Sequence, residues 1–336
     1  MPEPLLEVKD LRVHFPTDDG LVKAVDGVSF SIQPGETLGI VGESGSGKSV
    51  SSLTVMGLVT RKQADITGEV IFQGQDLLQL PVEEMRTIRG AKISMIFQDP
   101  MTSLHPYYRV GDQISEAIRE HRDISKKEAF DQAVDMLDKV RISQPKQRAR
   151  QYPHEFSGGM RQRAMIAMAL SLNPDLLVAD EPTTALDVTV QAQILDLIDK
   201  LKAEFNAAVI IITHDLGVVA EHCDNIEVMY AGKIAEYGRT DDIYYGPHHP
   251  YTWGLLNSIP HLGTETERLN PIRGLPPSLI NVPPGCSFNP RCPYVFDRCV
   301  RDVPELIPED GHHAAACHLS REDKERILHE EVLANR

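Results

Sequence analysis

The chain has 336 residues, of which 41% are hydrophobic and 25% are charged, so its composition is that of a globular protein. The formal net charge of −15 argues against nonspecific binding to nucleic acid. No apolar run is long enough to span a bilayer, and the start "MPEPLLEVKD" lacks the features of a signal peptide. We therefore expect a cytoplasmic protein that reaches a membrane only through partners.

The first predicted elements are strands. The stretches "LLEVKDLRVHF" and "AVDGVSFSI" alternate apolar and polar residues, which predicts antiparallel strands. "GEVIFQGQDL" adds another strand followed by a turn. The chain thus opens with an antiparallel β region.

A phosphate-binding loop follows in "TLGIVGESGSGKSVSSL". The apolar residues 38–41 predict a short strand, and a helix is expected to begin near Lys48, so the pattern G-x-x-x-x-G-K-[ST] has the strand–loop–helix context that it requires. Lys48 would reach the β- and γ-phosphates, and the Ser49 hydroxyl would ligate Mg²⁺. The glycines would let backbone N–H groups converge on phosphate oxygens. The predicted nucleotide contacts are Gly42, Glu43, Ser44, Gly45, Ser46, Gly47, Lys48 and Ser49.

Acidic residues end a second apolar strand in "PDLLVADEPTTALD". Asp180 is placed to hold Mg²⁺, and Glu181 could polarise a water toward the γ-phosphate. A third strand, in "AAVIIITHD", ends before His214, which could donate to a phosphate oxygen. Taken alone, two acids and a histidine at strand ends are more often structural, and these roles depend on the neighbouring phosphate loop.

Helical periodicity marks the middle of the chain, in "VGDQISEAIREH" and "KEAFDQAVDMLDKVRI". Further on, "EFSGGMRQR" places Ser157 and two glycines at the start of another helix, an arrangement that suits an anion. Ser157 is also expected to cap that helix.

These motifs, in this order, resemble those of ABC-type ATPases. The resemblance covers residues 5 to about 240 and rests on residues 42–49, Gln98 in "MIFQDP", "FSGGMRQR", "LLVADEP", "TALD" and "IIITHD". "FSGGM" departs from the common form L-S-G-G-Q at its first and last positions. The family implies an α/β fold with a P-loop, RecA-like core (residues 1–97 and 164–245), an antiparallel β subdomain, an inserted helical subdomain (residues 98–163) and here a C-terminal extension (residues 246–336).

The same resemblance implies individual roles and a partner. Glu181, Lys48, Gln98 and His214 would be catalytic, with Gln98 sensing Mg²⁺ and the attacking water and His214 contacting the γ-phosphate. Ser157, Gly158 and Gly159 would complete the ATP site of a second ATPase subunit, identical or related, and Asp187 would communicate across that dimer. Phe15 would stack on adenine, or else belong to the core.

The C-terminal extension contains four of the five cysteines, Cys286, Cys292, Cys299 and Cys317. Prolines at 276, 277, 283, 284, 290 and 293 argue against helix or central strand there. Four thiolates fit zinc or an iron–sulfur cluster, and with zinc a histidine (His312, His313 or His318) could replace a thiolate. Cys223, predicted in a helix after His214, is expected to be a small buried apolar residue.

The sequences "HHPYTWGLLNSIP", "IRGLPPSL" and "PPGCSFNPRCPYVFDRC" resemble the C-terminal extension of the ATPases of oligopeptide and dipeptide importers, a branch that includes nickel importers. This resemblance implies a [4Fe–4S] cluster, with zinc as the alternative. It also implies two membrane permease subunits, an extracytoplasmic peptide-binding protein acting indirectly, no nucleic acid, and a peripheral place on the cytoplasmic face of the membrane. A soluble ABC ATPase acting on DNA or ribosomes is the rival from another class.

Overall fold

Two units make up the fold of the computed structural model, which describes residues 3–99, 103–184, 187–258 and 272–332. The first unit consists of Met1–Leu5, Gln33–Glu36 and Gln79–Ile212. The second consists of Leu6–Ile32, Thr37–Leu78 and Thr213–Arg336. The predicted division into core, helical subdomain and extension stays a prediction, and its boundary after residue 163 falls inside a helix, α7 (Gly158–Leu170).

Parallel strands form the sheet of the first unit. β7 (Leu176–Asp180) lies between β6 (Ile93–Ile96) and β8 (Ala208–Thr213), pairing Leu176 with Ile93 on one side and with Ala208 on the other. Every side chain of β7 and β8 is buried, as expected for parallel strands covered on both faces. The predicted strand ending at Asp180 and the one ending before His214 are confirmed.

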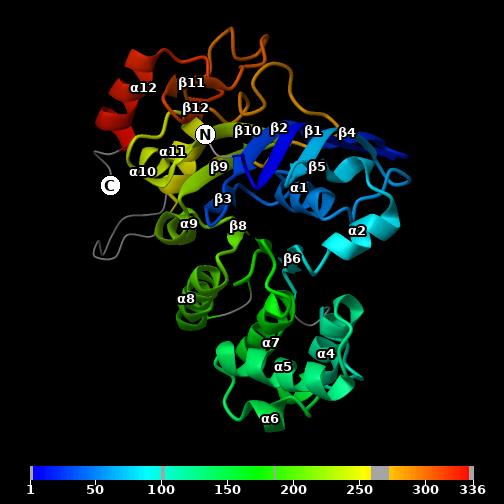
Figure 1. The fold of residues 1–336 in the computed structure, drawn as a ribbon. Coiled ribbons are helices and arrows are strands. Elements are labelled where there is room, and N and C mark those ends of the chain that lie inside the picture. The colour runs from blue at the N-terminus through cyan, green and yellow to red at the C-terminus, as the bar shows by residue number, and fades with distance from the viewer. Residues whose placement is uncertain (1–2, 100–102, 185–186, 259–271, 333–336) are drawn as a thin grey trace. The chain divides into compact units, whose positions relative to one another are not determined.

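Helices make up the rest of the first unit, and α4, α5 and α7 pack against one another (Figure 1). The sequence periodicity predicted α4 and α5, and both are confirmed. The helices are α2 (Val82–Ile88), α4 (Val110–His121), α5 (Lys126–Lys139), α6 (Pro145–Arg148), α7 and α8 (Val188–Phe205).

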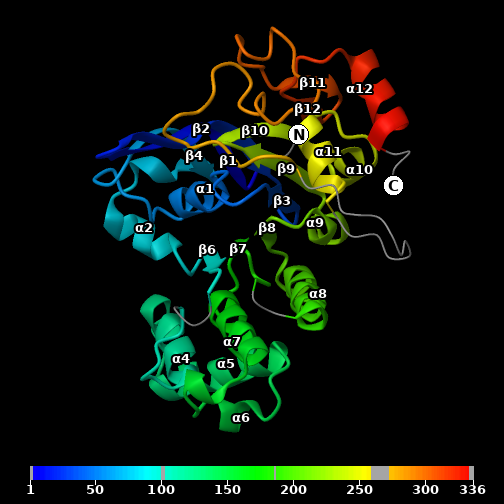
Figure 2. The same cartoon turned by 180° about the vertical axis from the view of Figure 1, so that it is seen from behind.

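An antiparallel sheet opens the second unit, in the order β2-β1-β4-β5. β1 and β2 form the predicted pair, with Leu6 opposite Ile32, and β4 adds to the other edge of β1. Helix α1 lies against β1 and β2 (Figure 2). The strands are β1 (Leu6–Thr17), β2 (Gly20–Ile32), β4 (Asp65–Phe72) and β5 (Gln75–Asp76), and the helix is α1 (Lys48–Val55).

A second group of strands in this unit joins the phosphate-loop strand to the extension. Their order is β11-β12-β10-β9-β3, with β3 and β9 parallel and the other pairs antiparallel. They are β3 (Thr37–Val41), β9 (Asn225–Tyr230), β10 (Lys233–Arg239), β11 (Ile307–Asp310) and β12 (His313–Ala315). The extension therefore adds two strands beyond β10.

Short helices and irregular backbone complete the second unit. The helices are α9 (Leu216–His222), α10 (Thr240–Tyr245), α11 (Pro250–Leu256) and α12 (Arg321–Ile327), followed by a π-helical turn, Leu328–Val332. Residues 272–306 contain neither helix nor strand, as their prolines predicted. Cys223 lies directly after α9 rather than within it, partly buried against the core, because the helix ends at His222.

The core of the second unit extends into the C-terminal extension. Tyr251 from α11 is fully buried, with its ring centroid 4.6 Å from that of Tyr230 on β9 and 5.4 Å from that of Phe288. Cys286 and Cys292 pack against the same cluster. Aromatic packing of this kind fixes the irregular segment onto the strands beneath it.

Candidate functional site

The phosphate-binding loop of the second unit joins β3 to α1, as the sequence predicted. Gly42, Gly45 and Gly47 all have positive φ. At Gly47, which precedes the first residue of α1, φ is 107° and a Cβ atom would lie 2.3 Å from the Ala24 carbonyl oxygen. A side chain is excluded there, so bare backbone faces the start of the helix, where an anion is stabilised.

Lys48 lies inside this loop. Its side chain is buried, and Nζ donates hydrogen bonds to the carbonyl oxygens of Gly42 (2.7 Å) and Glu43 (2.9 Å). Ser49 follows at the second position of α1 and is half-buried, while Ser44 is exposed. The hydroxyl oxygen of Ser46 is buried and has no hydrogen-bond partner among the described residues. The loop thus presents an ammonium group and polar atoms that suit phosphate.

Glu43 is tied to the C-terminal extension, which sequence reasoning did not predict. Its N–H donates to the Tyr251 hydroxyl (2.8 Å), and its carboxylate accepts two hydrogen bonds from Arg291. These partners are more than 200 positions away in the chain, at separations of 208 and 248 residues. Only the acid in the loop and the arginine directly before Cys292 could have hinted at the pair.

The other predicted residues of the second unit are His214 and Phe15. His214 follows β8 directly and is exposed, ahead of α9. The next residue, Asp215, caps α9 by accepting from the Gly217 N–H at 2.8 Å. Phe15 is half-buried in the hairpin of β1 and β2, opposite Val22. Whether Phe15 stacks on adenine or belongs to the core stays a prediction with two alternatives.

The acidic edge of the first unit brings Gln98 and Glu181 together. Glu181 Oε2 accepts from Gln98 Nε2 and from the Thr184 hydroxyl, both at 2.8 Å. Its φ of 45° lies in the left-handed region, a conformation that costs free energy for a residue with a side chain. Asp180, one position earlier at the carboxyl end of β7, is 6% exposed. The two acids therefore lie in different surroundings, and their two roles stay a prediction.

The signature stretch begins a helix of the first unit, α7. Ser157 caps it by accepting from the Met160 N–H at 3.3 Å, which confirms the predicted cap. Ser157 and Gly158 are exposed, and Gly159 is half-buried. Asp187 caps α8 in the same way, accepting from the Val190 N–H at 3.0 Å. Two residues of "TALD", at 185 and 186, lie outside the described residues, as do residues 100–102 of the predicted contact stretch after Gln98.

One small cavity in the second unit is lined by all four cysteines of the extension, together with His249 and His318. Burial raises the pKa of the Cys286 thiol, that of Cys292 to about 12 and that of Cys317 to about 11. Within the residues that the structure describes, no three histidine, cysteine or acidic side chains form a site for a single metal ion. The predicted four-cysteine grouping thus occurs, without the convergence that one ion needs.

The three alternative histidine ligands are placed differently. His318 lines the cavity, while its Nε2 lies 2.8 Å from the Asp302 carbonyl oxygen. His313 is buried 2.7 Å from a carboxylate oxygen of Glu236, and His312 is exposed; neither lines the cavity. His249, to which the sequence assigns no role, does line it, and burial lowers its pKa to about 4.

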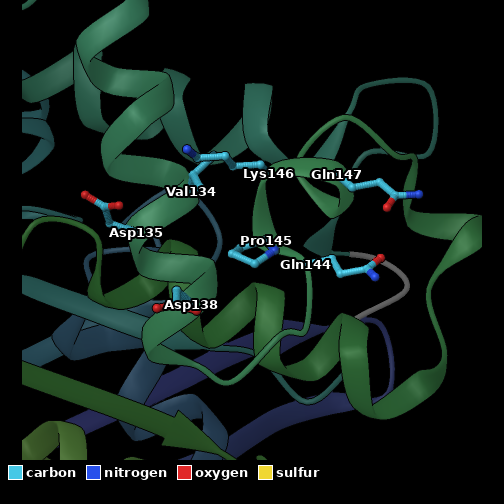
Figure 3. Close-up of a pocket in the computed structure, with 7 residues that line it drawn as sticks. All are labelled: Val134, Asp135, Asp138, Gln144, Pro145, Lys146 and Gln147. Atoms are coloured by element: carbon cyan, nitrogen blue, oxygen red, sulfur yellow. The ribbon is translucent and has the colours of Figure 1, made fainter.

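A separate surface pocket of about 470 Å³ lies in the helical part of the first unit (Figure 3). Val134, Asp135 and Asp138 of α5 line one side, and residues 144–147 around α6 line the other. None of the predicted site residues lines it. No helix of the described residues combines the length and the apolar character needed to cross a membrane.

Two family models match the chain, one before and one after residue 200. Residues 25–184 match the model described as ABC transporter, and residues 235–299 match the one described as oligopeptide/dipeptide transporter, C-terminal region. The chain is 56% identical to the oligopeptide transport ATP-binding protein OppD of Salmonella typhimurium, covering 93% of each chain. It is 52% identical to the dipeptide transport ATP-binding protein DppD of Bacillus subtilis, covering 97% of this chain and 98% of that one.

Solved structures match the core. The dimeric structure of MJ0796, a bacterial ABC transporter cassette, has a TM-score of 0.63 at 27% identity and covers 70% of this chain and 98% of that one. The structure of cbiO1 from Clostridium perfringens, part of the transporter complex cbiONQ, has a TM-score of 0.62 at 25% identity and covers 73% and 92%. The first structure thus leaves 30% of the present chain uncovered and the second leaves 27%.

Proposed function

This chain belongs to the ABC transporter ATPases of the oligopeptide/dipeptide importer family, and from that premise we propose that it powers peptide uptake through two membrane permease subunits. It is an ATP-hydrolysing enzyme of the ABC type. The observation that carries the proposal is the presence, in one chain, of the ATPase core and of this transporter family's C-terminal region. The relatives named for peptides do not favour the alternatives, a nickel importer or an ATPase acting on DNA or ribosomes.

In the proposed chemistry Lys48 neutralises charge on the β- and γ-phosphates, and backbone N–H groups of the loop that are not bonded within the protein, as that of Glu43 is to Tyr251, bind their oxygens. Mg²⁺ would be ligated by the Ser49 hydroxyl, with Asp180 and Gln98 as its further partners. Glu181 would polarise the attacking water, and the hydrogen bond from Gln98 supports that role because it orients the carboxylate. His214 would donate to the γ-phosphate.

A second subunit would complete the ATP site with Ser157, Gly158 and Gly159. Support comes from the exposure of Ser157 and Gly158 at the start of α7, a 13-residue helix whose N-terminal N–H groups favour an anion. A dimeric relative of the core supports it as well. ATP would then bridge two chains, and hydrolysis would release them, which drives the permeases. The partner would be an identical or a related ATPase. The chain would lie peripherally on the cytoplasmic face of the membrane, and an extracytoplasmic peptide-binding protein would deliver peptide to the permeases.

The test is Glu181→Gln in the transporter reconstituted with its permeases. We expect ATP binding to persist and turnover to fall by roughly 100-fold or more, because the variant cannot polarise water. Glu128→Gln, an exposed glutamate on α5, is the control and should turn over normally. Near-normal turnover of Glu181→Gln would remove Glu181 from the catalytic role.

The dimer has its own test in Ser157→Asp. Aspartate caps helices as well as serine does, so the fold should persist. Its negative charge would repel the phosphate of the facing subunit, and ATP-driven dimerisation should be lost. If Ser157→Asp dimerises and hydrolyses ATP normally, Ser157 acts only as a helix cap.

The four cysteines would hold a [4Fe–4S] cluster. One zinc ion needs its four donors about 2.3 Å from a single point, whereas a cluster spreads its thiolates over separate iron atoms. What supports a shared site is the one small cavity that all four cysteines line. When bound, the cluster would supply a covalent staple for the irregular backbone around it. Iron and acid-labile sulfide in anaerobically purified protein would support it; stoichiometric zinc without iron would reject it.

A further inference from the structure

We propose that Arg291 of the C-terminal extension is a positioning residue of the ATP site, acting through Glu43 of the phosphate-binding loop. The inference rests on the loop being the site of ATP binding. It assigns the extension a part in setting nucleotide affinity, beyond any staple that the cysteines hold. Arg291 does not contact the nucleotide in this proposal; it neutralises and orients the one acid in the loop.

The pair has the geometry of a strong ion pair. Arg291 Nη1 lies 2.5 Å from Glu43 Oε2, and Nη2 lies 3.0 Å from Oε1, so the two planar groups meet in a bidentate fork. The Arg291 side chain is 4% exposed and that of Glu43 is 27% exposed. Burial lowers the pKa of Arg291, but its hydrogen bonds to Glu43 and Tyr230 outweigh burial and raise it. The contact is therefore much less screened than a surface ion pair.

Arg291 also makes contacts with the extension and with the ring of Tyr230. Arg291 Nε donates to the Arg273 carbonyl oxygen at 3.0 Å, and Nη2 reaches the Gly274 carbonyl oxygen at 3.4 Å. The guanidinium carbon lies 5.9 Å from the ring centroid of Tyr230 and 6.0 Å from that of Phe288. These contacts orient the guanidinium in addition to its bonds with Glu43, so that less side-chain freedom is lost in holding the acid.

Glu43 is held at each of its polar groups. Its N–H donates to the buried Tyr251 hydroxyl, its carboxylate accepts from Arg291, and its carbonyl oxygen accepts from Lys48 Nζ. Two of these partners come from the extension, and the third is the lysine that the phosphate requires. A shift of Glu43 would therefore move the carbonyl oxygen that Lys48 Nζ contacts. The extension is thus linked to the phosphate-binding lysine through two successive contacts, from Arg291 to Glu43 and from Glu43 to Lys48.

Loss of Arg291 would weaken nucleotide binding through a change in charge as well as a change in geometry. Without its partner, the Glu43 carboxylate becomes an uncompensated negative charge in a loop that must bind a polyanion. A purely structural tether would make a different prediction, because removing the acid as well would then bring no recovery. The two explanations therefore separate in a double variant.

The experiment measures binding of a fluorescent, non-hydrolysable ATP analogue with Mg²⁺ to the full chain, alongside thermal unfolding. We expect Arg291→Met to weaken binding by roughly 10-fold, and Arg291→Lys, which keeps the charge but loses the fork, by roughly 3-fold. The double variant Arg291→Met/Glu43→Gln should recover at least about 3-fold relative to Arg291→Met, because the unpaired charge is gone. Tyr251→Phe, which keeps the buried ring, tests the second contact and should weaken binding by about 3-fold.

Arg301→Met is the matched control, because Arg301 is an exposed arginine of the same extension that pairs with Asp297 at 3.3 Å. It should bind like the wild type. Wild-type affinity in Arg291→Met, or an Arg291→Met defect that Glu43→Gln does not relieve, would overturn the proposal. Lys48→Ala separates this failure from a wrong site: if it also binds normally, the loop is not the ATP site, whereas loss in Lys48→Ala alone would reject only the role of Arg291.

Discussion

The phosphate-binding loop (residues 42–48) and the C-terminal extension (residues 246–336) belong to the same unit, but different forces hold them in place. In the loop, the backbone is held in place because neighbouring backbone segments approach it closely. A Cβ atom at Gly42 would lie 2.2 Å from the Met229 carbonyl oxygen, and the Gly232 N–H donates to the Ser46 carbonyl oxygen at 2.9 Å. Glycine is required there because nothing larger fits.

The extension depends on side chains instead. Glu236 on β10 accepts hydrogen bonds from the backbone N–H groups of His248 and His249 and lies 2.7 Å from His313 Nε2. Trp253 Nε1 donates to the Pro247 carbonyl oxygen at 2.7 Å. Gly285 of the extension resembles the loop glycines, because a Cβ atom there would lie 2.3 Å from the Cys299 carbonyl oxygen. The extension is therefore expected to be more sensitive to loss of polar side chains, and the loop to added atoms.

Glu236→Ala should have the largest effect on stability. The carboxylate is fully buried, and its removal leaves His313 and two backbone N–H groups without their acceptor, so the free energy of unfolding should fall by about 3–5 kcal/mol. Chemical denaturation measures this. Glu325→Ala removes an exposed ion pair of the same extension with Arg321 and should change stability by less than about 0.5 kcal/mol. Equal effects of the two variants would show that the buried carboxylate does not hold the extension.

Gly47→Ala should have the next largest effect, and it should appear in ATP binding. The added Cβ would meet the Ala24 carbonyl oxygen at 2.3 Å, so the loop must shift, and we expect roughly 10-fold weaker binding with a stability loss of about 1–3 kcal/mol. Gly74→Ala is the control: its φ is also positive, at 80°, but its Cβ would meet nothing within 4 Å. If Gly74→Ala costs as much as Gly47→Ala, backbone conformation rather than close approach is what matters, and the contrast with the extension is lost.

The same contrast explains what could be predicted from sequence. The predicted fold class, an α/β ABC-type core, is confirmed by the matching structures, and the strands and helices around the loop lie where periodicity placed them. The spacing of glycines and the periodicity of apolar residues are local signals, so a single sequence displays them. Spacing does not specify the Gln98–Glu181 contact, but each of the two residues belongs to a local motif that the sequence displays.

Contacts made by the extension could not be predicted in that way. The Arg291–Glu43 pair and the Glu236–His313 pair join residues 248 and 77 positions apart, and neither residue of either pair forms part of a periodic pattern with its partner. Choosing partners among so many charged side chains requires knowing the path of an irregular chain. The four cysteines were the exception, because their crowding in the sequence already indicated a shared site.

A third prediction concerns β9, the strand that lies between the loop strand β3 and the extension-bearing strand β10. Glu227 of β9 pairs in register with Ile40 and Tyr237, is fully buried, and has no hydrogen-bond partner for either carboxylate oxygen among the described residues. Burial raises its pKa from 4.5 to about 8. The carboxyl group is therefore neutral in the folded protein at neutral pH.

Glu227→Gln should consequently stabilise the protein at alkaline pH. Since the folded-state pKa lies above the unfolded one, the unfolded chain releases its proton first, and the wild type loses stability as pH rises from about 4.5 to about 8. Glutamine never ionises, so the gain should grow across that window and exceed about 1 kcal/mol near pH 8.5. Denaturation at several pH values measures the slope, and parallel profiles would mean that Glu227 has an ordinary pKa. Because β9 contacts both β3 and β10, hydrogen exchange should show the gain in the loop strand and in the extension together; protection of only one would mean that the two regions open independently.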